Sequence, residues 1–87
     1  MADHSAIEAS RRKANALPAY AYVRRTYGVN PGIGQRVQHT ITLWFGTIAR
    51  EDLSLSHYVM VQFDGNSFAL PCHPTELDYQ PKEVAHG

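Results

Sequence analysis

The sequence of 87 residues contains a single cysteine, Cys72, and no apolar run long enough to cross a membrane. One cysteine cannot form a disulfide within the chain, which argues against a small secreted domain held together by disulfides. The first residues are polar, from Asp3 to Ser5, and do not match a signal peptide. These absences predict a cytoplasmic protein with no membrane partner.

The sequence also lacks an excess of charge, with 8 basic and 8 acidic residues, but the two signs are placed unevenly. Residues 1–30 carry five cations and two carboxylates, whereas residues 31–87 carry three cations and six carboxylates. Either the basic segment packs on the acidic part of the same or a neighbouring chain, or it contacts a nucleic acid or an acidic protein. The five cations are Arg11, Arg12, Lys13, Arg24 and Arg25.

Residues 1–32 are predicted to form a helical leader and a linker. Ser5 and Glu8 have the spacing of a capping box, in which each side chain satisfies a backbone donor at the start of a helix. Helix-forming residues continue to Leu17, and Pro18 then ends the helix, kinks it or starts a second one.

The second helix is indicated by Tyr20, Val23 and Tyr27, which share one helical face. Gly28 follows, and glycine readily adopts the left-handed backbone conformation that often ends a helix. An apolar stripe this small cannot sustain an isolated helix of about ten residues in water. We therefore expect the helix to dock on the acidic part of the chain or of a symmetry mate, or to bind a partner.

Residues 33–80 are predicted to form five short strands, near residues 35–39, 44–50, 58–63, 68–70 and 77–79. Gly46, inside the second of these, suggests a bulge or a sharp bend. In the third strand Val59, Val61 and Phe63 alternate with an outward-facing set. That outward set is Tyr58, Met60 and Gln62.

The turn Asp64-Gly65-Asn66 is predicted to close a tight hairpin, after which Phe68 and Leu70 resume the alternation. Pro71 and Pro74 are expected to break the ladder because proline cannot donate a backbone hydrogen bond. A final strand with Leu77 and Tyr79 and a flexible tail over residues 81–87 complete the chain. The fold class is mainly β, a small five-stranded SH3-like barrel with an N-terminal α-helical leader; the alternative is a three-stranded meander under the helices.

Three segments carry a resemblance: Gly34-Gln35-Arg36-Val37, Trp44-Phe45-Gly46-Thr47-Ile48, and the stretch from Tyr58 to Gly65. Together they resemble the Gly-x-Arg-Val, Gly-x-Ile and Val-x-Phe-Asp pattern of KOW-type SH3-like barrels. The segments 18–29 and 73–79 are similar to small uncharacterised proteins of phages and prophages. This second resemblance covers about residues 17 to 80 and implies a phage- or prophage-encoded protein in the host cell cytoplasm, without an activity to carry over.

A more distant likeness is to the plasmid-borne type II dihydrofolate reductases, which are SH3-like barrels that assemble as tetramers around an active pore. The segments 34–37 and 44–48 lie where that family has similar residues. The family's pore motif, Val-Gln-Ile-Tyr, would fall near Phe68-Ala69-Leu70-Pro71, where its glutamine and tyrosine are missing. The resemblance therefore does not extend to the residues that would carry reductase activity.

The titratable residues do not form a recognisable catalytic or metal site. No two of the five histidines have the spacing of a zinc site, and the adjacent Cys72 and His73 should point to opposite faces of a strand. We expect Cys72 to pack as a small apolar residue and His73 to cap the turn before the last strand. The sequence thus predicts no catalytic residue, no metal and no cofactor.

Four aromatic residues could form a stacking platform for single-stranded nucleic acid, although some must fill the core: Trp44, Phe45, Tyr58 and Phe68. Only Arg36 and Arg50 lie among them. The leading hypothesis is a non-catalytic binding or assembly module for a protein partner or a second copy. The alternatives are a nucleic-acid-binding accessory domain and a diverged reductase-like enzyme. The expected partner-binding residues are Arg11, Arg12, Lys13, Tyr20, Arg24, Arg25, Tyr27, Trp44 and Tyr58.

Overall fold

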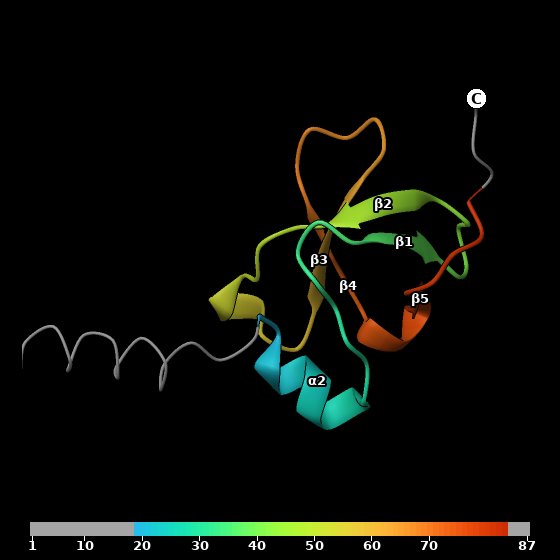
Figure 1. Cartoon of the computed structure of the whole chain (residues 1–87). Helices are drawn as coiled ribbons and strands as arrows, with labels where there is room; N and C mark the ends of the chain where they lie inside the picture. Colours follow the sequence, from blue (N-terminus) through green and yellow to red (C-terminus); the bar gives the residue numbers. More distant parts are fainter. Residues whose placement is uncertain (1–18, 84–87) are drawn as a thin grey trace, which may run out of the picture.

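The computed structural model describes residues 19–83 and shows a five-stranded antiparallel sheet that curls into a half-barrel, with one short helix packed against it (Figure 1). The strand order is β4-β3-β2-β1-β5. The mainly β class is confirmed. The helix expected from Ser5 to Leu17 and the end of the tail, residues 84–87, lie outside the described residues. Between residues 19 and 83 no helix is long and apolar enough to span a membrane.

The strands follow the predicted order; four of them are shorter than predicted, and β4 has the predicted length but begins two residues later. They are β1 (Arg36–His39), β2 (Phe45–Ile48), β3 (Val59–Phe63), β4 (Leu70–Cys72) and β5 (Leu77–Asp78). The remaining elements are helix α2 (Ala21–Tyr27) and two single 3₁₀ turns, η1 (Leu53–Leu55) and η2 (Pro74–Glu76).

Strand β3 forms the centre of the core, as the alternation predicted. Val59, Val61 and Phe63 are buried, and Gln62 is exposed on the other face. Met60 was also expected on the exposed face, but only 9% of its surface is accessible. Its backbone explains part of this, because the Met60 amide donates to the hydroxyl of Tyr20, which covers this end of the strand.

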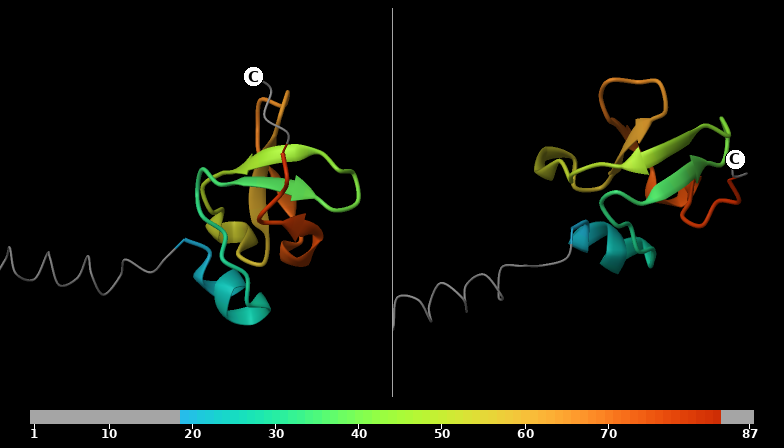
Figure 2. Two further views of the ribbon diagram at one scale, coloured as in Figure 1. Left: turned by 45° about the vertical axis from the view of Figure 1, so that its right-hand side comes forward. Right: turned by 45° about the horizontal axis from the view of Figure 1, so that its top comes forward.

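Gly46 does not mark a bulge, which was one of the two alternatives that the sequence suggested. The register runs without interruption across it, with Val37 opposite Gly46 on one side and Phe63 opposite Gly46 on the other. The glycine is needed for close approach, because a Cβ atom there would lie 2.6 Å from Cγ1 of Val61 and 2.9 Å from a backbone oxygen. The sheet can therefore curl tightly at this point (Figure 2).

The turn after β3 is confirmed, but the hairpin is longer than predicted. The amide of Asn66 donates to the carbonyl of Phe63 at 2.9 Å, and Gly65 has a φ of 91°. Phe68 does not continue a strand, because it lies in the connection to β4 with 63% of its surface exposed.

Pro71 does not break the ladder but lies inside β4, opposite Met60. The Met60 amide donates to Tyr20 and its carbonyl accepts from Ala49, so both groups point away from β4. Pro71 therefore sits opposite a residue that offers β4 no hydrogen-bonding group, where the missing N–H costs nothing.

Helix α2 packs on the half-barrel of its own chain through the predicted stripe. Tyr20, just before the helix, and Val23 are fully buried, and Tyr27 packs against the same core. Gly28 caps the helix in the left-handed region, with φ 70°, and its amide donates to the carbonyl of Arg24. A helix of seven residues is too short to be stable alone, so this packing holds it in place.

Candidate functional site

The turn between β1 and β2 carries an exposed apolar surface, on the right of the view in Figure 1. The exposed fraction is 72% for Ile41, 62% for Leu43 and 58% for Trp44. We call these three residues the turn patch. Single exposed apolar side chains are ordinary on protein surfaces, but three within four residues of one turn are a candidate contact surface.

The backbone of the turn is fixed by hydrogen bonds from β1. Nδ1 of His39 accepts from the amides of Ile41 and Thr42, at 3.2 Å each. The amide of Leu43 donates to the carbonyl of His39 at 2.8 Å, and the Gln38 side-chain amide donates to the carbonyl of Leu43. The turn patch therefore sits on an ordered support.

Leu43 adopts a strained backbone conformation, with a φ of 67°. The left-handed region is unfavourable for a bulky residue and costs about 1–3 kcal/mol unless the surroundings impose it. The hydrogen bonds to His39 and Gln38 impose it here, although the side chain gains little burial in return. Strained residues cluster at functional sites, and Leu43 is therefore a candidate contact residue.

Trp44 packs against the aromatic ring of Phe63. Its ring centroid lies 5.8 Å from that of Phe63 at 72°, and the Phe63 ring meets the His39 ring edge-on at 6.2 Å. Beside the tryptophan is an open hollow of about 390 Å³. Its lining residues are Leu43, Trp44, Phe45, Phe63, Asp64 and Asn66.

A second hollow of about 260 Å³ continues the first, because both are lined by Phe63, Asp64 and Asn66. It extends over Thr47 and Gln62, which face each other across β2 and β3. We call the two hollows together the groove. The groove runs from an apolar end at the turn patch to a polar end beside the turn at Gly65.

The charged group of the groove is Asp64, which lines both hollows and whose carboxylate is held by Arg36. The guanidinium donates to both Asp64 oxygens, at 2.7 and 2.6 Å, and to both Glu83 oxygens, at 3.1 and 2.7 Å. The hydrogen bond to Arg36 lowers the pKa of Asp64, and the two carboxylates raise the pKa of Arg36. Asp64 is therefore ionised at neutral pH.

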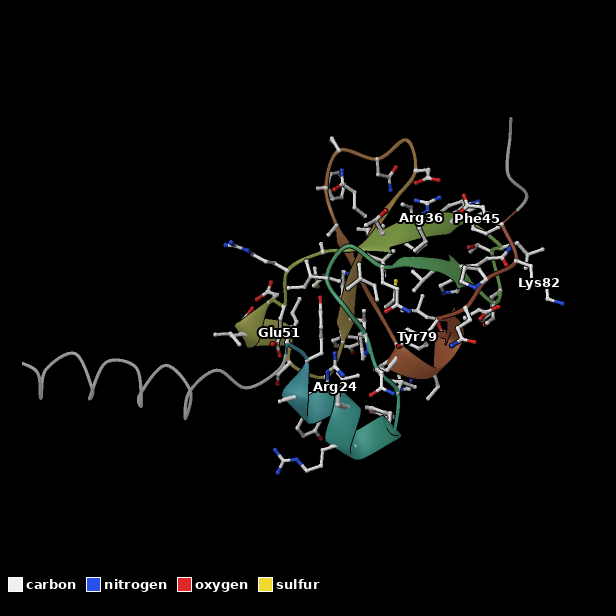
Figure 3. The ribbon with its side chains drawn as sticks, in the orientation of Figure 1. Arg24, Arg36, Phe45, Glu51, Tyr79 and Lys82 are labelled. Atoms are coloured by element: carbon white, nitrogen blue, oxygen red, sulfur yellow. The ribbon has the colours of Figure 1, made fainter. Side chains whose placement is uncertain are left out.

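The same contacts place Glu83, which the sequence put in the flexible tail, against β1. In Figure 2 the segment that follows β5 crosses beside β1 and β2, and Figure 3 shows the Arg36 and Phe45 side chains close together at this end of the sheet. Ion pairs as exposed as these contribute little to stability. We therefore assign to the cluster of Arg36, Asp64 and Glu83 the role of positioning the wall of the groove.

The residues that could suggest enzyme chemistry have structural roles. Burial raises the pKa of the Cys72 thiol to about 11, which disfavours the reactive thiolate at neutral pH. Nδ1 of His73 accepts from the amide of Thr75, so the predicted cap of η2 is confirmed. Among residues 19–83, no three His, Cys, Asp or Glu side chains are grouped so that they could hold a metal ion.

The structure does not bring the nine predicted partner-binding residues to one surface. Arg11, Arg12 and Lys13 lie outside the described residues. Tyr20 is fully buried, and its hydroxyl donates to the Ala49 carbonyl at 2.6 Å, so it is not available to a partner.

Arg24 is also occupied within the chain, because its guanidinium binds the carbonyls of Ala19 and Pro31 and the side chain of Asn30. Figure 3 shows Arg24 at α2, with Glu51 near the start of the helix and away from Phe45.

The other predicted contact residues are dispersed. Tyr27 is partly buried, with its ring 5.3 Å from that of His73, and Arg25 is exposed on α2. Tyr58 is 39% exposed and precedes β3, whereas Trp44 contacts Phe63 at the other end of that strand. The aromatic residues therefore do not form one continuous platform, and Trp44 alone of the nine lies in the turn patch.

Ile41 and Leu43 were not among the expected partner-binding residues, because residues 40–43 were expected to form only a loop or a ragged hairpin between two strands. The available signal was the composition of the turn itself, Thr40-Ile41-Thr42-Leu43, in which bulky apolar residues replace the usual glycine, asparagine or aspartate. Apolar side chains in a short turn have no core to enter, which is a reason to expect them at a contact surface.

Comparison with protein-family models, with characterised proteins and with solved structures finds no match.

Proposed function

We propose that this protein is a non-catalytic binding or assembly module, an SH3-like barrel that presents the turn patch and the groove to a protein partner. The observation that carries the proposal is the turn patch: Leu43 is held in a strained conformation and Trp44 is braced on Phe63, yet both remain exposed. Tryptophan at the edge of an apolar hollow is a frequent anchor in protein interfaces. The likeness of residues 17–80 to small phage and prophage proteins supports a phage or prophage origin and a place in the host cell cytoplasm.

The charges at the groove favour a protein over a nucleic acid. Asp64 lines both hollows and keeps its negative charge, so a phosphate backbone there would be repelled. Arg36, the nearest cation, is already bound to Asp64 and Glu83.

The proposal is tested by substitution of the turn patch in the full chain. Leu43→Ser and Trp44→Ala should abolish retention of a partner from extracts of the cells that produce the protein. The matched control is Leu53→Ser, because Leu53 is 82% exposed but lies in η1, away from the groove. Partners retained equally by the wild type and by both turn-patch variants would overturn the proposal.

The second candidate is a nucleic-acid-binding accessory domain, and the observation that favours it is the exposed Arg25 on α2, in a chain whose first 30 residues carry four further cations. Binding through phosphates would weaken steeply as salt rises, because each contact releases counterions. Fluorescence anisotropy with a single-stranded oligonucleotide at several salt concentrations separates the two. Salt-sensitive binding that is lost in Arg25→Glu and retained in Trp44→Ala would replace our first proposal with the second.

A further inference from the structure

The sequence of the chain itself contains a segment with the chemistry that the groove would accept. Residues 11–17 read Arg-Arg-Lys-Ala-Asn-Ala-Leu, three cations followed by an apolar residue. The groove offers the complementary order, with the apolar side chains of Leu43 and Trp44 at one end and Asp64 where the two hollows meet. Residues 33–83, which form the half-barrel, carry six carboxylates and three cations.

We propose that residues 11–17 of a second copy of this chain occupy the groove, with Leu17 on the turn patch and the three cations toward Asp64. This inference rests on the proposed function and names its partner. Favourable long-range attraction between the basic segment and the acidic half-barrel would speed the encounter, and burial of Leu17 against Trp44 would hold it.

The second copy is required because the same chain is too short to reach. The amide of Tyr20 donates to Oε1 of Glu51, which follows Phe45 by six residues. Strand Phe45–Ile48 alone spans roughly 10 Å, and three further residues carry the chain on to Glu51. Leu17 precedes Tyr20 by three residues, which reach about 10 Å when fully extended. A leader that cannot fill its own groove can fill that of a neighbour, and exchange in both directions closes a dimer.

The test uses Trp44, which is the only tryptophan in the sequence and therefore reports on the turn patch alone. Acrylamide quenching of its fluorescence is measured on the full chain across a wide range of protein concentration, with molar mass followed by light scattering. We expect quenching to fall and the mass to double as the concentration rises, because the leader of the second copy covers the indole ring.

Two leader variants and one control decide whether the leader is responsible. Leu17→Ser, and the triple variant Arg11→Glu, Arg12→Glu, Lys13→Glu, should both lose the concentration dependence. Asn15→Gln, which changes neither charge nor apolar surface, should keep it. Circular dichroism melts of the three variants check that the half-barrel is unchanged.

Two results would overturn the inference. One is a wild-type chain whose quenching and mass do not depend on concentration. The other is a concentration dependence that persists in both leader variants, since another surface would then mediate the association. In either case a protein partner lost in Trp44→Ala and retained in Leu53→Ser would leave the proposed function standing, so the two failures can be told apart.

Discussion

The two ends of the half-barrel treat an aromatic side chain in opposite ways. At the α2 end Tyr20 is fully buried, and its hydroxyl donates to Ala49 and accepts from Met60. At the turn end Trp44 leaves 58% of its surface in solvent. Within the described residues no buried side-chain polar atom lacks a partner, so the α2 end is complete as it stands. The difference shows that the α2 end contributes a completed part of the core, whereas the turn end keeps an aromatic side chain exposed, where we propose that a partner binds.

At the α2 end, the hydroxyl of Tyr20 is inserted between strands of the sheet. The Ala49 amide donates to the Met60 carbonyl, as in a regular ladder, but the reverse bond from Met60 to Ala49 is replaced by two bonds through the Tyr20 hydroxyl. Helix docking and the end of the β2–β3 pairing therefore depend on the same oxygen atom.

The largest expected effect belongs to the core that both ends share. Val61→Asp should unfold or aggregate the protein, at a cost of about 4 kcal/mol or more, because an unpaired charge would enter a fully buried site. The control is Gln62→Asp on the exposed face of the same strand. If Val61→Asp melted at the wild-type temperature, β3 would have the opposite face inward.

Tyr20→Phe should lower the free energy of unfolding by about 1–3 kcal/mol, because the Ala49 carbonyl and the Met60 amide would lose their partner. Tyr22→Phe is the control, since Tyr22 is 39% exposed and makes only an edge contact with His57. Denaturant titration measures both. Equal midpoints for the two variants would contradict a structural role for the Tyr20 hydroxyl.

Gly65→Val should also cost about 1–3 kcal/mol, but through the backbone, because a β-branched residue resists the φ of 91° at this turn. No atom lies within 4 Å of the Cβ position, so steric overlap does not contribute. Gly65→Asn should recover most of the loss, since asparagine tolerates positive φ. A similar midpoint for both variants would point away from strain as the cause.

Alkaline pH should weaken the α2 end first. Burial raises the pKa of Tyr20, that of Cys72 to about 11 and that of Tyr79 to about 12. Because the folded pKa values are raised, the neutral forms stabilise the fold at low pH, and this stabilisation is lost from about the usual thiol pKa of 9.0 up to about 12.

The denaturant midpoint measured against pH would show this decline. Cys72→Ala should shift its onset upward, whereas Asp64→Asn should leave the alkaline limb unchanged. Asp64 has a lowered pKa, so its contribution disappears only at acid pH.

Trp44→Ala should have the smallest effect on stability, about 1 kcal/mol or less, because the lost contact is one exposed aromatic pair with Phe63. Its effect on partner retention should be large. A thermal melt measures the effect on stability, and the retention assay measures the effect on partner binding. A loss of several kcal/mol would mean that the turn end is part of the core and would remove the contrast with Tyr20.

Local signals in the sequence were enough for the order of the strands and for several turns and caps, but they misplaced β4. The alternation of Val59, Val61 and Phe63, the positive φ of Gly65 and Gly28, and the cap by His73 each depend on neighbours within a few residues. Periodicity and turn chemistry report such short-range requirements directly.

The site could not be predicted in the same way, because it depends on distant pairs. Tyr20 and Trp44 are both amphipathic aromatic residues in the sequence, and only the bonds from Tyr20 to residues 29 and 40 positions away decide which one is buried. The pairing of Arg36 with Asp64 spans 28 positions and places the groove wall. Periodicity placed Tyr20 on the apolar face of the helix, but it carries no information about these long-range bonds or about the exposure of Trp44.

The position of Pro71 has a consequence for how copies of this protein can associate. An open sheet can template the addition of another strand along its outer edges, which is the route to edge-to-edge aggregation. At one edge, the outward-facing nitrogen of β4 belongs to proline and offers no donor; at the other edge, β5 is only two residues long. Both edges of the described sheet are thereby blunted, which favours association of copies through side chains over a continuous backbone ladder.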